Sequence, residues 1–209
     1  MKYFLGILMS RPVPNHLIVS GLHTLPFRAG FGTGNSMRLH FKNSSGIPSS
    51  FLTPIFFNQT IANADLSIFN SGLIQGQGAS SSAIYSYGGN VNIVNEGTIQ
   101  STLQTAIALT GTLGSTLQNT GLISSPTNAV ILGSGDDAIS NQGIIEGDIL
   151  LSSGDDIYDG IGGFLGGKIN LGHGDDTARM GDNDDFIIGA ERDDDGGSNA
   201  GQTYLILGK

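Results

Sequence analysis

Cysteine and tryptophan are absent from this chain of 209 residues, and charge is scarce. Without cysteine the chain forms no disulfide bond and has no thiol nucleophile. Charged residues make up 13 % and hydrophobic residues 38 % of the chain, both low for a globular domain with a thick core. No hydrophobic run is long enough to span a bilayer. These absences favour a thin, repetitive fold that needs few apolar residues per repeat.

Basic residues are missing from the middle of the chain, with no Lys or Arg between residues 43 and 167. Residues 1–64 carry five basic residues and no acid, whereas sixteen of the eighteen acids lie between Asp136 and Asp195. The net charge of −9 therefore combines a basic head with a very acidic tail. A phosphate-binding surface needs a basic patch, so a nucleic-acid partner is not expected.

Two short motifs recur along the remaining chain. The first is Gly-Asp-Asp, with copies that begin at Gly135, Gly154 and Gly174, in steps of 19 and 20 residues. The second reads apolar-x-Asn-x-Gly-x-Ile, and its steps shrink from 25 to 24 to 22 residues. Its asparagines are Asn70, Asn95, Asn119 and Asn141.

Both motifs belong to one repeat, because equivalent apolar residues precede each corner. These residues are Ile84, Ile107, Val130, Ile149 and Ile169. A repeat of about 20 residues is typical of a solenoid whose coils stack on one another. We therefore expect an all-β, right-handed parallel β-solenoid of about six coils over residues 61–189. Stacked in register, the four asparagines would form an amide ladder.

The expected organisation has three parts. Residues 1–60 do not follow the repeat and are expected to form an irregular cap or an assembly segment, in which 37–42 and 51–57 read as strands. A cleavable signal peptide at Tyr3–Met9 is the alternative for the first residues. Residues 61–131 form Asn-x-Gly coils with neutral corners, in which Gly89-Asn90-Val91 stands where later coils carry Gly-Asp-Asp. Residues 132–209 form acidic coils and end with a strand at 203–207.

Stacking of the acidic loops would place their six aspartates in one column, about one strand spacing of 4.8 Å apart. Unit charges at that range repel one another, so the column is expected to hold a cation. Calcium is the natural choice because it takes carboxylate and carbonyl oxygens. A solvated acidic turn without an ion is the alternative.

At these loops the chain resembles the repeats-in-toxin family of calcium-binding nonapeptides, whose pattern is Gly-Gly-x-Gly-x-Asp-x-apolar-x. The resemblance covers about 132–201 and implies a β-roll with calcium held by the second Asp of each loop, together with glycine carbonyls. Unlike the family, most copies here recur once per coil; the nine-residue step occurs only at Gly181. The implied calcium-site residues are Gly133, Gly135, Asp136, Asp137, Gly154, Asp155, Asp156, Gly172, Gly174, Asp175, Asp176, Asp182, Asp184 and Asp185.

No sequence pattern indicates an enzyme. There is no His-Glu-x-x-His zinc motif and no Gly-x-Ser-x-Gly elbow. The acids lie in glycine-rich corners without nearby basic or aromatic residues for sugar binding, although a polysaccharide-cleaving site stays an alternative. Asp193-Asp194-Asp195 reads as a flexible acidic loop, and His173 sits at a variable loop position.

We expect a non-enzymatic, secreted structural protein of a bacterial cell surface, matrix or filament, stabilised by calcium. The alternative is the calcium-binding module of a larger toxin, adhesin or polysaccharide-acting enzyme exported by a one-step secretion system. Open strand edges and the opposite charges of head and tail also predict end-to-end self-association.

Overall fold

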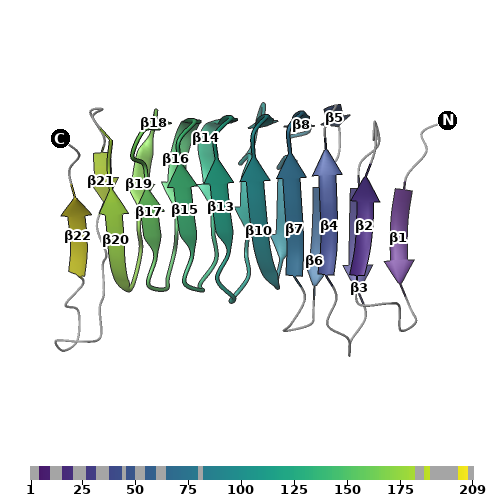
Figure 1. The fold of residues 1–209 in the computed structure, drawn as a ribbon, viewed down its shortest axis with the longest axis horizontal. Coiled ribbons are helices and arrows are strands. Elements are labelled where there is room, and N and C mark those ends of the chain that lie inside the picture. Colours follow the sequence, from purple (N-terminus) through teal and green to yellow (C-terminus); the bar gives the residue numbers. More distant parts are fainter. Residues whose placement is uncertain are drawn as a thin grey trace.

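The protein is an all-β solenoid with parallel sheets, as the sequence predicts, and it has about five turns rather than the six expected. Its computed structural model describes residues 5–9, 16–20, 27–31, 38–43, 46–49, 55–59, 65–79, 82–181, 186–188 and 202–206. Strands of successive coils lie side by side along one axis, with the two chain ends at opposite ends of the stack (Figure 1). No helix occurs in these residues, and hence none that could cross a membrane.

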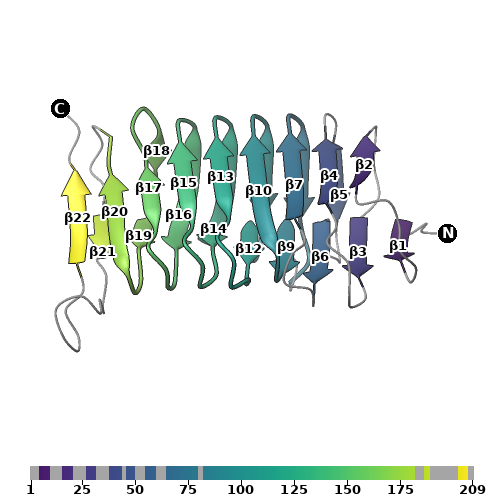
Figure 2. The same ribbon diagram turned by 60° about the horizontal axis from the view of Figure 1, so that its bottom comes forward.

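All strands pair in parallel within two sheets, which are visible as two rows of arrows in Figure 2. The nine-stranded sheet contains β2 (His16–Ser20), β4 (Arg38–Asn43), β7 (Asp65–Asn70), β10 (Asn90–Asn95), β13 (Thr116–Asn119), β15 (Ala138–Asn141), β17 (Ile157–Asp159), β20 (Asp175–Arg179) and β22 (Gln202–Ile206). The second sheet supplies the other strands of each coil.

The thirteen-stranded sheet bends around the core, because its long strands β14 and β16 each pair with strands on two sides of a coil. Its strands are β1 (Leu5–Met9), β3 (Phe27–Phe31), β5 (Gly46–Ser49), β6 (Ile55–Gln59), β8 (Leu73–Gly76), β9 (Ile84–Tyr87), β11 (Thr98–Ser101), β12 (Ile107–Leu109), β14 (Leu122–Ile131), β16 (Ile144–Leu150), β18 (Phe164–Leu165), β19 (Lys168–Asn170) and β21 (Phe186–Ile188).

Both sheets cross the boundary expected at residue 60. Strand β4 pairs with β7 so that Asn43 lies opposite Asn70, and β5 pairs with β8 so that Ile47 lies opposite Ile74. Residues 43–47, Asn-Ser-Ser-Gly-Ile, are thus an earlier copy of the Asn-x-Gly motif of the same length, in which Ser45 stands in sequence where the later copy has Gly72. The strands expected near 37–42 and 203–207 correspond to β4 and β22; of the strand expected at 51–57, residues 55–57 lie in β6 and residues 51–54 lie outside the described residues. A separate N-terminal segment stays a prediction.

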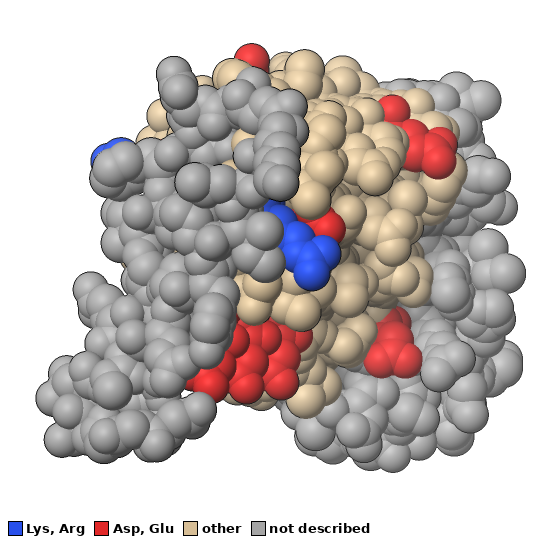
Figure 3. Space-filling model, turned by 60° about the vertical axis from the view of Figure 1, so that its left-hand side comes forward, with Lys and Arg blue, Asp and Glu red and all other residues tan. Residues whose placement is uncertain are grey.

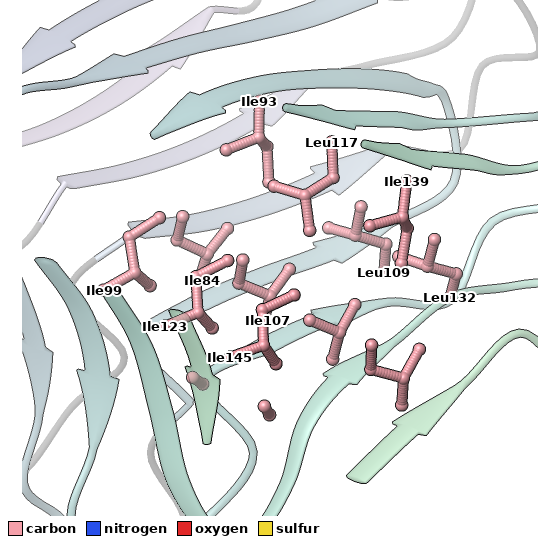
Figure 4. Close-up of a cluster of buried hydrophobic side chains, with 14 of the residues drawn as sticks. Ile84, Ile93, Ile99, Ile107, Leu109, Leu117, Ile123, Leu132, Ile139 and Ile145 are labelled. Carbon is pink, nitrogen blue, oxygen red and sulfur yellow. The ribbon is translucent and has the colours of Figure 1, made fainter. Parts of the chain in front are cut away.

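The core consists of apolar columns that run along the solenoid axis (Figure 4). One column links Ile84, Ile107 and Val130 and continues to Ile149 and Ile169, as the sequence predicts. Each of these side chains is fully buried. Alternation along the strands explains the columns, because every second residue of a strand faces the same side. Each coil thereby contributes only a few aliphatic side chains to the core.

The asparagine ladder forms as expected. Asn70 donates from Nδ2 to Asn95 Oδ1 at 2.8 Å, Asn95 donates to Asn119 at 2.8 Å, and Asn119 donates to Asn141 at 2.9 Å. All four side chains are buried. The same amides also donate to backbone carbonyls of the following corner, such as Asn119 Nδ2 to Ile144 O at 3.2 Å. The ladder therefore fixes both the corner and the stacking register.

Replacing Asn119 by alanine should lower the free energy of unfolding by about 3 kcal/mol, because it leaves buried amide groups of its neighbours without partners. The matched control is Asn92→Ala on the outer face of the same sheet, where Asn92 Oδ1 accepts an exposed hydrogen bond from Thr116 Oγ1. That change should stay within about 0.5 kcal/mol. Denaturant unfolding measures both, and equal effects would contradict a structural role for the ladder.

Candidate metal centre

The Gly-Asp-Asp corners place their six aspartates in two parallel columns rather than in one. Strand pairing aligns Ala138 with Ile157 and Ile157 with Thr177, so the residues just before them, Asp137, Asp156 and Asp176, also stack. This inner column is buried, with exposed fractions of 2 %, 0 % and 0 %. The outer column contains Asp136, Asp155 and Asp175, the residues one position earlier. The alternating direction of side chains along a strand separates the two columns.

The inner column occupies a position of the apolar core. In the preceding coils the same position holds Leu66, Val91 and Ser115, four residues before the ladder asparagines of those coils. All three are buried. The side chain at this position thus changes along the axis from aliphatic to hydroxyl to carboxylate. Three carboxylates consequently lie where earlier coils bury hydrocarbon.

Each inner aspartate uses one carboxylate oxygen to bind the preceding coil. Asp137 Oδ1 accepts from Ser115 N–H at 2.6 Å, Asp156 Oδ1 accepts from Asp137 N–H at 2.8 Å, and Asp176 Oδ1 accepts from Asp156 N–H at 2.9 Å. The second oxygen, Oδ2, is buried in all three and has no hydrogen-bond partner. A buried polar atom without a partner is expensive, and a charged one more so. Each inner aspartate therefore has one buried carboxylate oxygen that no group of the described residues neutralises by a hydrogen bond.

Burial raises the pKa of every inner aspartate. The pKa of Asp156 rises from 3.8 to about 8, chiefly because burial disfavours the charged form; the hydrogen bond from Asp137 N–H opposes the rise, and the charges of Asp137 and Asp176 add to it. The pKa of Asp137 rises to about 7 for the same main reason. Burial also raises the pKa of Asp176, against the lowering effects of its backbone hydrogen bond and of His173.

The outer column forms a second ladder at the surface. Asp136 Oδ1 accepts from Asp155 N–H at 3.0 Å, and Asp155 Oδ1 accepts from Asp175 N–H at 3.0 Å. Acidic side chains gather into a compact patch on the face shown in Figure 3. Between residues 65 and 181 the chain has only two basic residues to offset them, Lys168 and Arg179. In the outer column Asp136 and Asp155 are exposed and Asp175 is half-buried, whereas all three inner aspartates are buried.

Glycines let the corners stack closely enough to form these columns. Gly154 and Gly174 have φ values of 124° and 134°, and a Cβ on Gly154 would lie 2.5 Å from Gly135 O. Gly133, Ser152 and Gly172 form a neighbouring column, in which Ser152 has a φ of 75°. Ser152, which departs from the glycine pattern in sequence, has a positive φ like Gly172, whose φ is 96°.

The donor set fits calcium in charge and in chemical type, because carboxylate oxygens are hard anionic ligands. Calcium takes six to eight oxygens, so backbone carbonyls and water would have to complete its shell. Within the described residues no three His, Asp or Glu side chains converge on one point. The column instead offers one buried, unpartnered carboxylate oxygen per coil, from Asp137, Asp156 and Asp176.

Several expected site residues cannot be placed. Asp182, Asp184 and Asp185 of the nine-residue step, and the run Asp193–Asp195, lie outside the described residues. His173 lies beside the columns, and its backbone donates to Ser152 O and accepts from Gly154 N–H. The site is therefore built from the corners of three coils.

Sequence reasoning identified the acidic corners but did not separate buried from exposed aspartates. It also missed Ser115, whose N–H supplies the first donor to the inner column. The spacing in the sequence could have revealed the buried position of Asp137. Leu66, Val91, Ser115 and Asp137 each precede a ladder asparagine by four residues. Comparison of the chain with protein-family models, with curated protein sequences and with solved structures finds no match in any of the three.

Proposed function

We propose that the protein is a non-enzymatic, extracellular structural solenoid of a bacterial surface, matrix or filament, and that its acidic coils bind calcium. The observation that carries this proposal is the buried column of Asp137, Asp156 and Asp176, each with an unpartnered Oδ2. A cation between successive coils would neutralise carboxylates that occupy a core position. Because these ligands belong to different coils, binding would be coupled to stacking and folding.

A structural role is favoured over a catalytic one by the geometry of the same carboxylates. The inner ones are buried and hold backbone N–H groups of the preceding coil, so a polymer substrate has no access to them. The outer ones accept regularly spaced backbone hydrogen bonds along the axis. General acid–base catalysis needs carboxyl groups within reach of the substrate's reacting atoms.

The extracellular assignment follows from the ion. A protein whose folding needs calcium stays loose where calcium is scarce and orders where calcium is abundant, which suits export of an unfolded chain. End-to-end stacking of copies is part of the proposal because each sheet ends in strands paired on one side, such as β2 and β22.

The test is a calcium titration of chelator-treated protein, followed by circular dichroism and light scattering, with magnesium as the ion control. At free calcium 100 times the dissociation constant, each site should add about 2.7 kcal/mol to the free energy of unfolding. The β signal should rise with calcium, and growing particle size would support end-to-end association. A rise at constant size would leave a monomeric calcium-binding solenoid.

The matched control is a triple variant, Asp137→Asn with Asp156→Asn and Asp176→Asn. Asparagine keeps an acceptor oxygen for the backbone N–H groups and removes the anionic ligands. It should fold without calcium and show no response to it. A wild-type protein that is fully β-structured in chelator, with melting unchanged by calcium, would overturn the proposed function.

A further inference from the structure

Along the solenoid axis, the buried core position described above changes from aliphatic side chains to aspartates, and Ser115 lies at the change. On the N-terminal side the core position holds Leu66 and Val91, and on the C-terminal side it holds Asp137, Asp156 and Asp176. Both kinds of coil share the same apolar columns, such as the one that joins Ile107 to Ile149 through Val130. The two parts therefore have one architecture but different needs for an ion.

The neutral coils satisfy their buried polar side chains without a ligand. Among the described residues, the buried side-chain atoms without a hydrogen-bond partner include Asp137 Oδ2, Asp156 Oδ2, Asn170 Oδ1, His173 Nδ1 and Asp176 Oδ2. None of them lies within 65–79 or 82–131. In that part Asn70, Asn95 and Asn119 are bonded along the ladder.

The hydrogen bonds that the inner aspartates accept all run in one direction along the axis. Ser115, in the last neutral corner, donates its N–H to Asp137 and accepts nothing from an inner aspartate in return. Each inner aspartate then receives its donor from the coil before it, as Asp156 does from Asp137, whereas the outer aspartates accept from the coil after them. The first acidic coil also docks its strand β15 on β13, which the neutral part provides. The neutral coils thus offer the acidic coils a strand to pair with, β13, and a hydrogen-bond donor, the N–H of Ser115.

We propose that residues 65–131 are a calcium-independent template and that residues 138–181 are a calcium-dependent extension which orders only on that template. This inference rests on the proposed calcium-binding function. The coupling is one-sided: the extension needs the template, whereas the template keeps its fold when the extension is loose. The chain then has two physical states, a short solenoid without calcium and a long one with it.

The test is amide hydrogen exchange, read by mass spectrometry on peptides from both parts, in chelator and in calcium. In chelator, strands β10 to β13 should exchange at least about 100-fold more slowly than β15 to β20. With calcium both parts should be protected. Template strands that exchange as fast as the extension in chelator would overturn the inference and leave calcium binding intact. An extension that is already protected in chelator would instead overturn the proposed function.

Two matched variants test the one-sided coupling in calcium. Ile107 and Ile149 are fully buried in the same column, one in the template and one in the extension. Ile149→Asn should remove protection from β15 to β20 and leave β10 to β13 protected. Ile107→Asn should remove protection from both parts. An extension that stays protected in Ile107→Asn, or a template that is lost in Ile149→Asn, would overturn the proposal.

Discussion

Replacing Asp156 by asparagine should stabilise the metal-free protein and weaken its response to calcium. The aspartate is fully buried between two other carboxylates, and its Oδ2 has no partner. Asparagine keeps the acceptor for Asp137 N–H but carries no charge. In chelator at about pH 8.5, the gain in free energy of unfolding should be on the order of 3 kcal/mol, the usual size of an uncompensated buried charge. Thermal or denaturant unfolding measures it.

The pH dependence of this gain has a definite sign. The pKa of Asp156 is raised from 3.8 to about 8 on folding, so the folded state binds the proton more tightly than the unfolded state. Stability in chelator is therefore greatest below pH 3.8 as far as this group is concerned, and it falls as the pH rises toward about 8. The advantage of asparagine should shrink as the pH is lowered, since the aspartate is then already neutral.

Asp155→Asn is the matched control, because it removes the same charge from the same loop. Asp155 is exposed, and its Oδ1 accepts from Asp175 N–H as the inner oxygens do from their neighbours. Its effect in chelator should stay within about 0.5 kcal/mol. If Asp156→Asn destabilised the metal-free protein at high pH, or matched Asp155→Asn, the inner column would not be a site of buried charge.

Replacing Gly121 by alanine should unfold the neutral coils or come close to it. A Cβ on Gly121 would lie within bonding range of Gly97 O and 2.8 Å from Glu96 C, both backbone atoms of the coil beneath. Neither atom can move unless the coils part, which would break Leu122 N–H to Gly97 O at 2.8 Å. Losses of about 4 kcal/mol or more are expected from such overpacking against backbone.

Gly166→Ala separates this steric effect from the general cost of replacing glycine. There the nearest atom to a new Cβ is Cε1 of Phe164 at 3.2 Å, on a ring that is 45 % exposed and free to turn. The melting temperature should hardly change. Similar losses in both variants would show that coil spacing does not depend on the glycine column at Gly121.

The fold was predictable because the residues that stack in one column recur in the sequence once per repeat. Asn70, Asn95, Asn119 and Asn141 recur with a glycine two residues later, and one side chain bonds the next in the structure. The early copy at Asn43 escaped notice because serine, Ser45, stands at the position of the motif glycine. Strand register, which places Asn43 opposite Asn70, reveals it.

The acidic site was predictable in position but not in environment. Gly-Asp-Asp marks the corner, yet two adjacent aspartates look alike in sequence, and only the alternation of strand faces makes Asp137 buried and Asp136 exposed. The sequence also did not show why the asparagine ladder ends at Asn141. After Asn141 the stacked position is taken by Gly160, where the buried ring of Tyr158 fills the space that an amide would need.

The parallel pairing of every coil has a mechanical consequence. Hydrogen bonds between parallel strands run across the strands and thus along the solenoid axis. Tension applied along that axis would act on all the coil interfaces in series, so the weakest interface would separate first, since each coil contacts only its neighbours. Force applied along the strands would instead load several bonds of an interface together. We therefore expect the solenoid to resist force along its strands better than tension along its axis.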